Sequence, residues 1–390
     1  MRASLFLIMA IACGLTVANL YYNQPLLALI ARDFNASAQD VSFIPTLTQV
    51  GYALGILLLV PLGDLVERRR LIVVMVLLTA IALILAALSP SLAWLTGSSF
   101  VIGVTAIAAQ IIVPFATQLT NPPNRGKVVG IMMGGLLLGI LLARTGSGFV
   151  AMAWGWRSVY WLASGLMLGL AFVLARGLPQ SQPALKLSYP HLMRSLIQLV
   201  QEQPRLQQAS LIGALSFGTF SAFWSTLAFL LEQPPYHYGS DVAGLFGLVG
   251  LVGAAAAPIV GKMADRHSPQ LTIGLGILTT VVSFVWLWLS GSHMLGLIAG
   301  AILLDLGIQT TQVSNQANLY RGPTAIHSRL NALYIMFYFV GGALGSFLGT
   351  YGWSTWGWSG VCWLSLGLLA IAAATFLLGN RDRRTSDSRA

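Results

Sequence analysis

Two ionisable residues stand inside long apolar runs of this sequence. Arg144 lies in the run LLARTGSG, and Asp305 is the only acidic residue well inside any such run. An ionisable side chain at membrane depth costs about 2.5–3.5 kcal/mol on insertion scales, so it is a functional candidate by default. A carboxylic acid there could carry a proton, whereas a guanidinium could bind an anionic group or lower the pKa of a coupling carboxylate. The alternatives are an Arg144 side chain that extends to the membrane surface and an Asp305 carboxylate used in helix packing.

Amide side chains accompany the acidic residue. Gln309, Gln312 and Gln316 follow Asp305 at i+4, i+7 and i+11, which places all four on one face of a helix. A polar stripe of this kind is typical of a helix that lines an aqueous path or binds a solute. The spacing therefore predicts that this helix contributes to a site within the membrane.

Other polar and aromatic side chains within the apolar runs complete the candidate pocket. The spacing i, i+3, i+4 predicts that Asn19, Tyr22 and Asn23 share one face of the first run. Any one of these residues alone is better explained by an interhelical hydrogen bond, worth about 0.6–2 kcal/mol, so the prediction rests on the set. The further candidates are Gln49, Gln110, Trp224 and Tyr334.

The composition determines which elements must position these residues. Of the 390 residues, 56% are hydrophobic and 8% are charged, whereas a soluble domain has about 25% charged residues. Most of the surface must therefore face lipid. The net charge of +10 is spread between the apolar runs, which argues against a nucleic-acid partner. The two cysteines and five histidines form no ligand or catalytic spacing, so we expect no metal, no cofactor and no enzymatic activity.

The apolar runs predict an all-α membrane protein of twelve spans, because each spanning helix needs roughly 20 apolar residues. Two sets of six runs are separated by a polar stretch. The runs are Leu5–Leu29, Val41–Leu62, Leu71–Leu88, Leu92–Gln118, Val128–Ala151, Ser158–Ala175, Leu206–Leu231, Val242–Val260, Leu271–Leu289, Met294–Asn315, Leu330–Tyr351 and Trp358–Leu378.

Basic residues fix the expected orientation. Of the 21 Lys and Arg residues, all but Arg32, Arg144 and Arg157 fall on one side of the predicted membrane. The positive-inside rule therefore places both termini and the middle loop in the cytoplasm. The expected organisation is a six-helix bundle over 1–176, a cytoplasmic linker over 177–205, a second bundle over 206–378 and a cytoplasmic tail over 379–390.

The two sets of runs resemble each other. Residues 154–162 read WGWRSVYWL and residues 356–364 read WGWSGVCWL, an offset of 202, and both segments enter the sixth run of their half. Asp64 and Asp265 follow the second and eighth runs at nearly the same offset. An interfacial aromatic anchor would explain the tryptophans but not the matched spacing. Internal repeats of this kind in membrane proteins usually mean a transporter, with the solute site between the halves near the bilayer midplane.

Several motifs resemble the major facilitator superfamily. The segment GKMADRHSPQ is similar to its loop signature through Gly261, Ala264, Asp265 and Arg266, and VPLGDLVERRR is a weaker first copy. The segments NLYYNQPLL and GLLLGILLARTGSG resemble its bacterial drug:proton antiporter-like branch. The resemblance implies two pseudo-symmetric six-helix bundles in the bacterial inner membrane. It further implies a gating motif, whose residues here are Asp64, Arg68, Arg69, Gly261, Asp265 and Arg266.

These patterns lead to one expected function and one rival. We expect a monomeric secondary active transporter that moves a small organic solute by alternating access, as proton-coupled efflux. The rival is an uptake or sugar-export facilitator with no proton coupling. Ser99 occupies the place where many proton-coupled relatives carry an Arg in the fourth helix, so coupling here would depend on Arg144 and Asp305. The expected partners are the small-molecule substrate, protons and the lipid bilayer.

Overall fold

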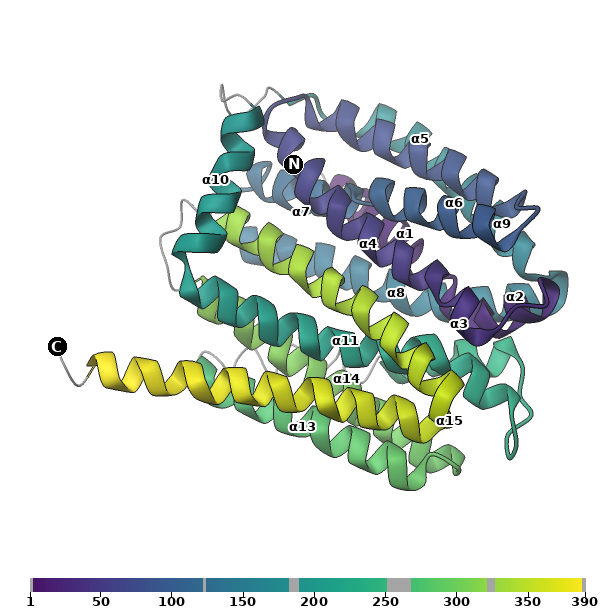
Figure 1. Cartoon of the computed structure of the whole chain (residues 1–390). Coiled ribbons are helices and arrows are strands. Elements are labelled where there is room, and N and C mark those ends of the chain that lie inside the picture. The colour runs from purple at the N-terminus through teal and green to yellow at the C-terminus, as the bar shows by residue number, and fades with distance from the viewer. Residues whose placement is uncertain (1–2, 122–123, 182–188, 251–267, 321–326, 388–390) are drawn as a thin grey trace. The chain divides into compact units, whose positions relative to one another are not determined.

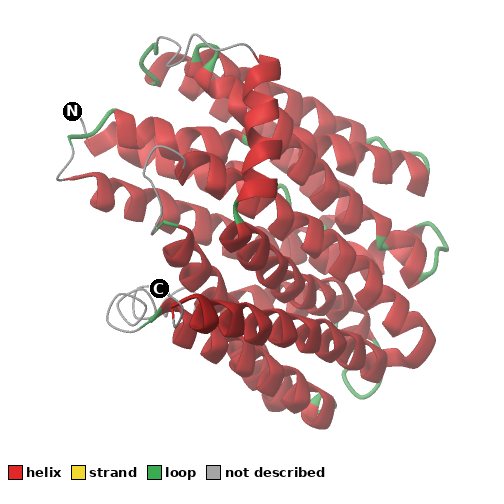
Figure 2. Ribbon diagram, turned by 60° about the vertical axis from the view of Figure 1, so that its left-hand side comes forward, coloured by secondary structure: helices red, strands yellow, loops and turns green. Residues whose placement is uncertain are grey.

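The computed structural model describes residues 3–121, 124–181, 189–250, 268–320 and 327–387. These residues form helices joined by turns and short loops, with no strand among them (Figure 2). The chain divides into two compact units, the first comprising 1–194 with 238–248 and the second comprising 195–237 with 249–390. The predicted all-α class is confirmed for the described residues.

The first unit is built from three closely packed helix pairs, which are α1 with α8, α4 with α6 and α5 with α9 (Figure 1). Short 3-10 turns at Gln24–Leu26 and Val60–Asp64 interrupt its apolar runs. Its helices are α1 (Ala3–Ala18), α2 (Leu27–Asp33), α3 (Ala38–Val41), α4 (Phe43–Leu58), α5 (Arg68–Ala87), α6 (Leu92–Thr105), α7 (Ala108–Gln118), α8 (Arg125–Trp154) and α9 (Trp156–Gly177).

The second unit packs α11 (Pro204–Glu232) against α15 (His327–Asp387), and α13 (Pro269–Ser290) against α14 (Met294–Leu319). The 61-residue α15 is two helices joined at Gly357, which has non-helical backbone angles. Its two legs run back from that bend in opposite directions (Figure 1). The helix continues through Asp387, so the predicted tail at 379–390 begins as helix.

Nine helices in the described part of the chain are long and apolar enough to cross a membrane. One of them is the 51-residue run Arg329–Gly379, and two shorter apolar helices cover Ser4–Ala18 and Ser240–Gly250. The chain therefore crosses the membrane many times, and the count of twelve remains a prediction. The predicted span Leu92–Gln118 is confirmed with the same bounds, although a turn separates α6 from α7 within it. The predicted helix over Leu5–Leu29 is wrong in its length, because α1 ends at Ala18.

The predicted polar linker at 177–205 contains a helix, α10 (Tyr189–Glu202). Its low mean hydropathy hides an amphipathic pattern in which Leu192, Leu196 and Leu199 are buried and Ile197 is exposed. The spacing i, i+4, i+7 places the three leucines on one face, and their burial explains why this segment is helical rather than extended.

The repeated tryptophan motif forms the same backbone bend in both copies. Gly155 has φ 80° and ψ 160°, and Gly357 has φ 61° and ψ −149°. This region of backbone space is essentially restricted to glycine. Each glycine ends one membrane helix and starts the next, with Trp156 or Trp358 immediately after it. The sequence repeat is therefore also a repeat of local structure.

We expect Gly357→Ala to lower the free energy of unfolding by about 1–3 kcal/mol, because alanine cannot adopt the backbone angles of the bend without strain. A Cβ at this position meets no atom within 4 Å, so the effect would come from the backbone alone. Thermal melting of the purified protein in detergent measures it. Gly367→Ala is the matched control, because Gly367 is helical and equally uncrowded. An unchanged melting temperature for Gly357→Ala would contradict the strain argument.

Glycines also allow helices to touch backbone to backbone. In the first unit, Gly14 of α1 lies against Gly135 and Gly139 of α8; in the second, Gly218 of α11 lies against Gly345 of α15. A Cβ on Gly139 or Gly345 would overlap main-chain atoms of the facing helix. Close approach of this kind replaces the hydrophobic effect as the main source of helix association within lipid.

Candidate functional site

Arg144 lies on α8 with its side chain inside the first unit, only 3% exposed. Its Nε donates a hydrogen bond to the Gln24 Oε1 at 2.7 Å. Its guanidinium carbon lies 4.9 Å from the centre of the Tyr21 ring. An aromatic face and an amide oxygen both stabilise a cation in a site of low dielectric constant. The arrangement therefore holds a positive charge within the span.

The sequence reasoning missed both of these partners. Tyr21 and Gln24 lie where the chain leaves α1, in a turn that continues into the 3-10 segment Gln24–Leu26. The prediction assumed a straight helix through this region and did not place Gln24 on the polar face. Pro25 was the available signal, because a proline inside a helix removes the hydrogen bond to the carbonyl four residues before it, here Tyr21, and clashes with that carbonyl.

The predicted common face of Asn19, Tyr22 and Asn23 is wrong for the same reason. The Asn19 Nδ2 donates to the Leu15 and Thr16 carbonyls at the end of α1, each at 3.0 Å. The Asn23 Nδ2 donates to the Thr48 Oγ1 of α4 at 3.4 Å. Because α1 ends at Ala18, helical spacing no longer applies to these residues and they point to different neighbours.

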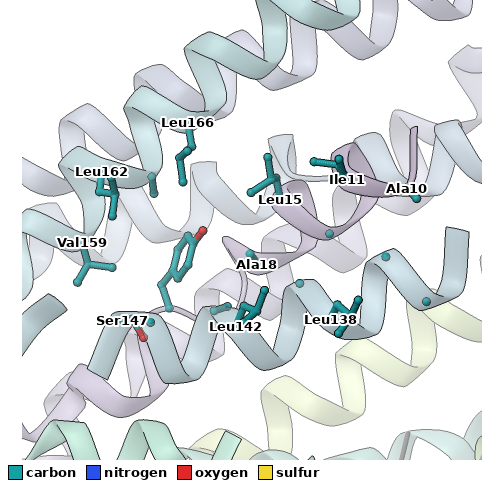
Figure 3. A pocket seen from close by; sticks show the side chains of 18 of the residues that line it. Ala10, Ile11, Leu15, Ala18, Leu138, Leu142, Ser147, Val159, Leu162 and Leu166 are labelled. Atoms are coloured by element: carbon teal, nitrogen blue, oxygen red, sulfur yellow. The ribbon is translucent and has the colours of Figure 1, made fainter. Parts of the chain in front are cut away.

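Tyr22, the remaining member of that set, lines an apolar groove between α1, α8 and α9 (Figure 3). It contributes to a different surface from the one that holds Arg144 and Gln24. The three candidates of the first helix therefore have three different surroundings. Asn19 bonds to the end of α1, Asn23 contacts α4, and Tyr22 lines this groove.

Gln49 and Gln110 belong to the adjoining helices of the first unit. Gln49 is buried on α4. The Gln110 Nε2 on α7 donates to the Tyr52 hydroxyl on α4 at 3.1 Å. Gln110 is half-buried and lies just after the break between α6 and α7. These amides place polar atoms inside the unit at positions that apolar side chains would otherwise fill.

The second unit carries the acidic candidate. Asp305 lies on α14 and is 6% exposed, and a Cβ built on Gly250 would lie 3.3 Å from its Oδ2. Since α14 is continuous from Met294 to Leu319, Asp305, Gln309 and Gln312 share one helical face. Gln309 is half-buried, and the Gln312 Oε1 accepts a hydrogen bond from the Tyr338 hydroxyl of α15 at 3.2 Å.

Aromatic rings surround this stripe within the second unit. The Phe217 ring stacks on the Tyr338 ring, with centroids 4.0 Å apart and an interplanar angle of 18°. Trp224 and Tyr334 are buried near them. The Trp224 ring centroid lies 6.0 Å from that of Phe220, and the Tyr334 ring centroid lies 6.0 Å from that of Tyr338. Phe217 is a residue that the sequence reasoning missed. Its apolar side chain carries no local signal that it would stack beside a tyrosine.

A second cluster of charges lies at the start of α5. The Arg68 Nη2 forms an ion pair with the Asp64 Oδ1 at 2.8 Å, and its Nε donates to the Gly63 carbonyl at 2.9 Å. Arg68 also contacts the Gln118 amide, and Arg69 donates to the Ala175 carbonyl at the end of α9. The first copy of the proposed gating motif therefore ties α5 to α7 and α9. The second copy, Gly261, Asp265 and Arg266, lies outside the described residues.

A smaller charged cluster lies at the opposite end of this unit. The Arg157 Nη1 donates to the Asp33 Oδ2 at 2.5 Å, and the Trp156 indole donates to the same oxygen at 3.1 Å. The Arg157 guanidinium, assisted by this indole, holds the pKa of the Asp33 carboxyl below its usual range. Both charged side chains are about 40% exposed, so this pair positions the loop and adds little stability.

The sequence and this all-helical fold together define the class of protein. The profile of the Major Facilitator Superfamily matches residues 7–323. The chain is 45% identical to the transporter YgaY of Escherichia coli strain K12, an alignment that covers 97% of this chain and 94% of that protein. It is 34% identical to the transporter SCO4007 of Streptomyces coelicolor, covering 95% and 87%. The chain therefore belongs to the Major Facilitator Superfamily and is a multi-pass membrane transporter, which confirms the predicted resemblance.

Solved structures agree on the fold. The chain superimposes with a TM-score of 0.80 and 15% identity on the crystal structure of a bacterial homologue of the human lysosomal transporter Spinster, over 97% of both chains. A more distant relative in sequence is a chloramphenicol efflux pump of Mycobacterium tuberculosis, 24% identical over 72% of this chain and 69% of that protein.

Proposed function

We propose that the chain exports a small amphipathic organic solute in exchange for protons, by alternating access of two six-helix bundles. The observation that carries this proposal is a buried ionisable residue in each unit, Arg144 in the first and Asp305 in the second. Charges within a span are costly to retain, so they are expected where a solute or an ion must be handled.

Asp305 is the proposed proton carrier. Burial favours the neutral form of a carboxylic acid, so such a group can be loaded with a proton on one side of the membrane and emptied on the other. Arg144 is the proposed partner of an anionic or strongly polar group of the solute. Its site already contains an amide oxygen and an aromatic face, which a polar solute could exchange for its own groups.

The proposed solute has a flat apolar part and several hydrogen-bonding groups. Stacked rings at Phe217 and Tyr338 would accept an aromatic ring. Amides at Gln309 and Gln312 of the same unit would exchange hydrogen bonds with it. Chloramphenicol has these features and is named as the cargo of one relative, so it is the first solute to test.

The proposed placement follows the charges of the sequence. We propose twelve membrane helices, both termini in the cytoplasm and insertion in the bacterial inner membrane as a monomer. The domain bounds 1–176, 177–205, 206–378 and 379–390 are part of this proposal. Asp64, Arg68 and Arg69, with Gly261, Asp265 and Arg266, form the proposed gating motif on the cytoplasmic side.

The decisive experiment measures chloramphenicol transport in proteoliposomes with and without an imposed pH gradient. The wild type is expected to concentrate the drug only when the gradient is present. Asp305→Asn keeps the size of the side chain and removes its titratable proton, so it should abolish the response to the gradient. Gln312→Leu is the control, because it removes a solute-binding group and should lower the rate while keeping the gradient dependence.

Transport that is equal with and without the gradient, in both wild type and Asp305→Asn, would contradict proton coupling and favour the uncoupled facilitator. Direction is tested separately, by comparing drug accumulation in cells that lack the gene and cells that overproduce the protein. Higher accumulation in the overproducing cells would favour uptake.

A further inference from the structure

The first unit carries an apolar groove of about 580 Å³ between α1, α8 and α9 (Figure 3). Leu138 and Leu142 of α8 stand at its edge and are 53% and 62% exposed. Tyr22 and Ser147 carry the only polar side chains among the described residues that line it. None of the proposed coupling or gating charges lines this groove. It is therefore a separate feature of the membrane-facing surface.

The groove is hollow because glycines stand where larger side chains would fill it. Gly134 and Gly146 line the groove, and a Cβ at either position would meet no atom within 4 Å. Close helix contact explains Gly135 and Gly139, but it does not explain these two. A helical glycine costs about 0.5–1 kcal/mol relative to alanine. The absence of side chains at Gly134 and Gly146 keeps a concave apolar surface open.

Positive charge lies at one end of this surface. Lys127 and Arg125 are exposed in the first turn of α8, where the helix dipole disfavours cations. Lys127, Ile131, Gly134 and Leu138 follow at i, i+4, i+7 and i+11, so the lysine stands over the same face as the groove. The N-cap residue Asn124 makes no side-chain capping bond. A phosphate group would complement both the two cations and the helix N-terminus.

The groove is longer than one leaflet. From Ile131 to Val150 the α8 residues that line it rise about 28 Å, whereas half of the hydrocarbon core is about 15 Å thick. We propose that the half of the groove nearest the α8 N-terminus, from Ile131 to Leu142, holds one acyl chain of an anionic phospholipid, whose phosphate binds Lys127 and Arg125. The lipid belongs to the leaflet on the side of the α8 N-terminus. It would fill the space between α1, α8 and α9 and stabilise their packing.

The test is native mass spectrometry of the full-length protein titrated with phosphatidylglycerol and with phosphatidylethanolamine. The wild type is expected to retain phosphatidylglycerol in preference. Gly134→Leu fills the groove and should weaken phosphatidylglycerol binding about tenfold, through the methylenes that it displaces. Gly130→Leu is the control, because Gly130 is equally uncrowded but does not line the groove.

Lys127→Gln should weaken the same binding about fivefold, the effect of one basic residue on an anionic headgroup. Arg70→Gln is its control, since Arg70 is an exposed basic residue in the first turn of another helix, α5. Equal retention of the two lipids, or equal effects of the groove variants and their controls, would overturn the proposal.

A second measurement needs no variant. Phosphatidylglycerol with a photoreactive acyl chain is expected to label residues 7–18 of α1 and 131–142 of α8 in the wild-type protein. Label spread evenly over the exposed apolar residues of the other helices would overturn the assignment. So would crosslinks from the groove to a second copy of the chain in place of lipid.

Discussion

Replacing Arg144 with methionine is expected to reduce chloramphenicol transport by about ten- to hundred-fold. Methionine keeps much of the length of the side chain but removes the charge-assisted hydrogen bond to Gln24 and the contact with the Tyr21 ring. Methionine also cannot make the charge-assisted hydrogen bond that Arg144 is proposed to make to the solute. Such a bond is worth about 1.5–3 kcal/mol, and each 1.4 kcal/mol corresponds to a factor of ten in rate. Initial rates in proteoliposomes, with protein amounts matched, give the measurement.

Arg144→Lys separates charge from shape. Lysine retains the positive charge but lacks the planar guanidinium, so its transport rate is expected to lie between those of the wild type and Arg144→Met. Melting curves in detergent accompany both variants to show that the protein remains folded. Unimpaired transport by Arg144→Met would remove this residue from the site.

The second large effect is expected from Gly345→Ala. A single methyl group at this position overlaps the Gly218 carbonyl of α11, and a main-chain atom cannot rotate away as a side chain can. Overpacking of this kind costs about 1–3 kcal/mol and occasionally more. We expect a lower melting temperature and a smaller yield of monodisperse protein. Fluorescence-detected size-exclusion chromatography after a series of heating steps measures both.

Gly130→Ala provides the comparison, because the same methyl group on α8 meets no atom within 4 Å. It should be neutral or stabilising by about 0.5–1 kcal/mol, the usual gain from removing a helical glycine. If the two substitutions change the melting temperature equally, the close backbone contact between α11 and α15 does not explain the glycine at position 345.

The features that sequence reasoning predicted well are those that depend on hydropathy and charge. Apolar runs indicate membrane helices whatever their neighbours are, and the runs at Leu271–Leu289 and Ser158–Ala175 lie within α13 and α9. The tryptophan repeat predicted two related halves, and both copies of the repeat contain the same backbone bend, at Gly155 and Gly357.

Helix interruptions were harder to predict. Pro25 disfavours an α-helix that continues through Tyr21, but hydropathy alone extended the run past it. The break at Ala106 and Ile107 carries no such signal, since neither residue disfavours a helix. Tertiary packing alone decides such a position.

The site was the least predictable part. Arg144 and Gln24 are 120 residues apart in the chain. In the second unit, the Phe217 ring of α11 stacks on the Tyr338 ring of α15. Spacing along one helix can indicate which residues share a face. It cannot indicate which other helix that face will meet.

The packing of residues 238–248 within the first unit has a consequence for how the protein is made. The Ser240 hydroxyl donates to the Gly148 carbonyl at 3.1 Å, and Gly244 accepts a hydrogen bond from Thr145, so this part of α8 is completed by residues that follow 92 positions later. At roughly 5–20 residues per second, those residues leave the ribosome about 5–18 s after Gly148 does. During this interval α8 holds its buried arginine in the bilayer without the helix that later covers it. Membrane insertion must therefore tolerate an incomplete first unit for several seconds.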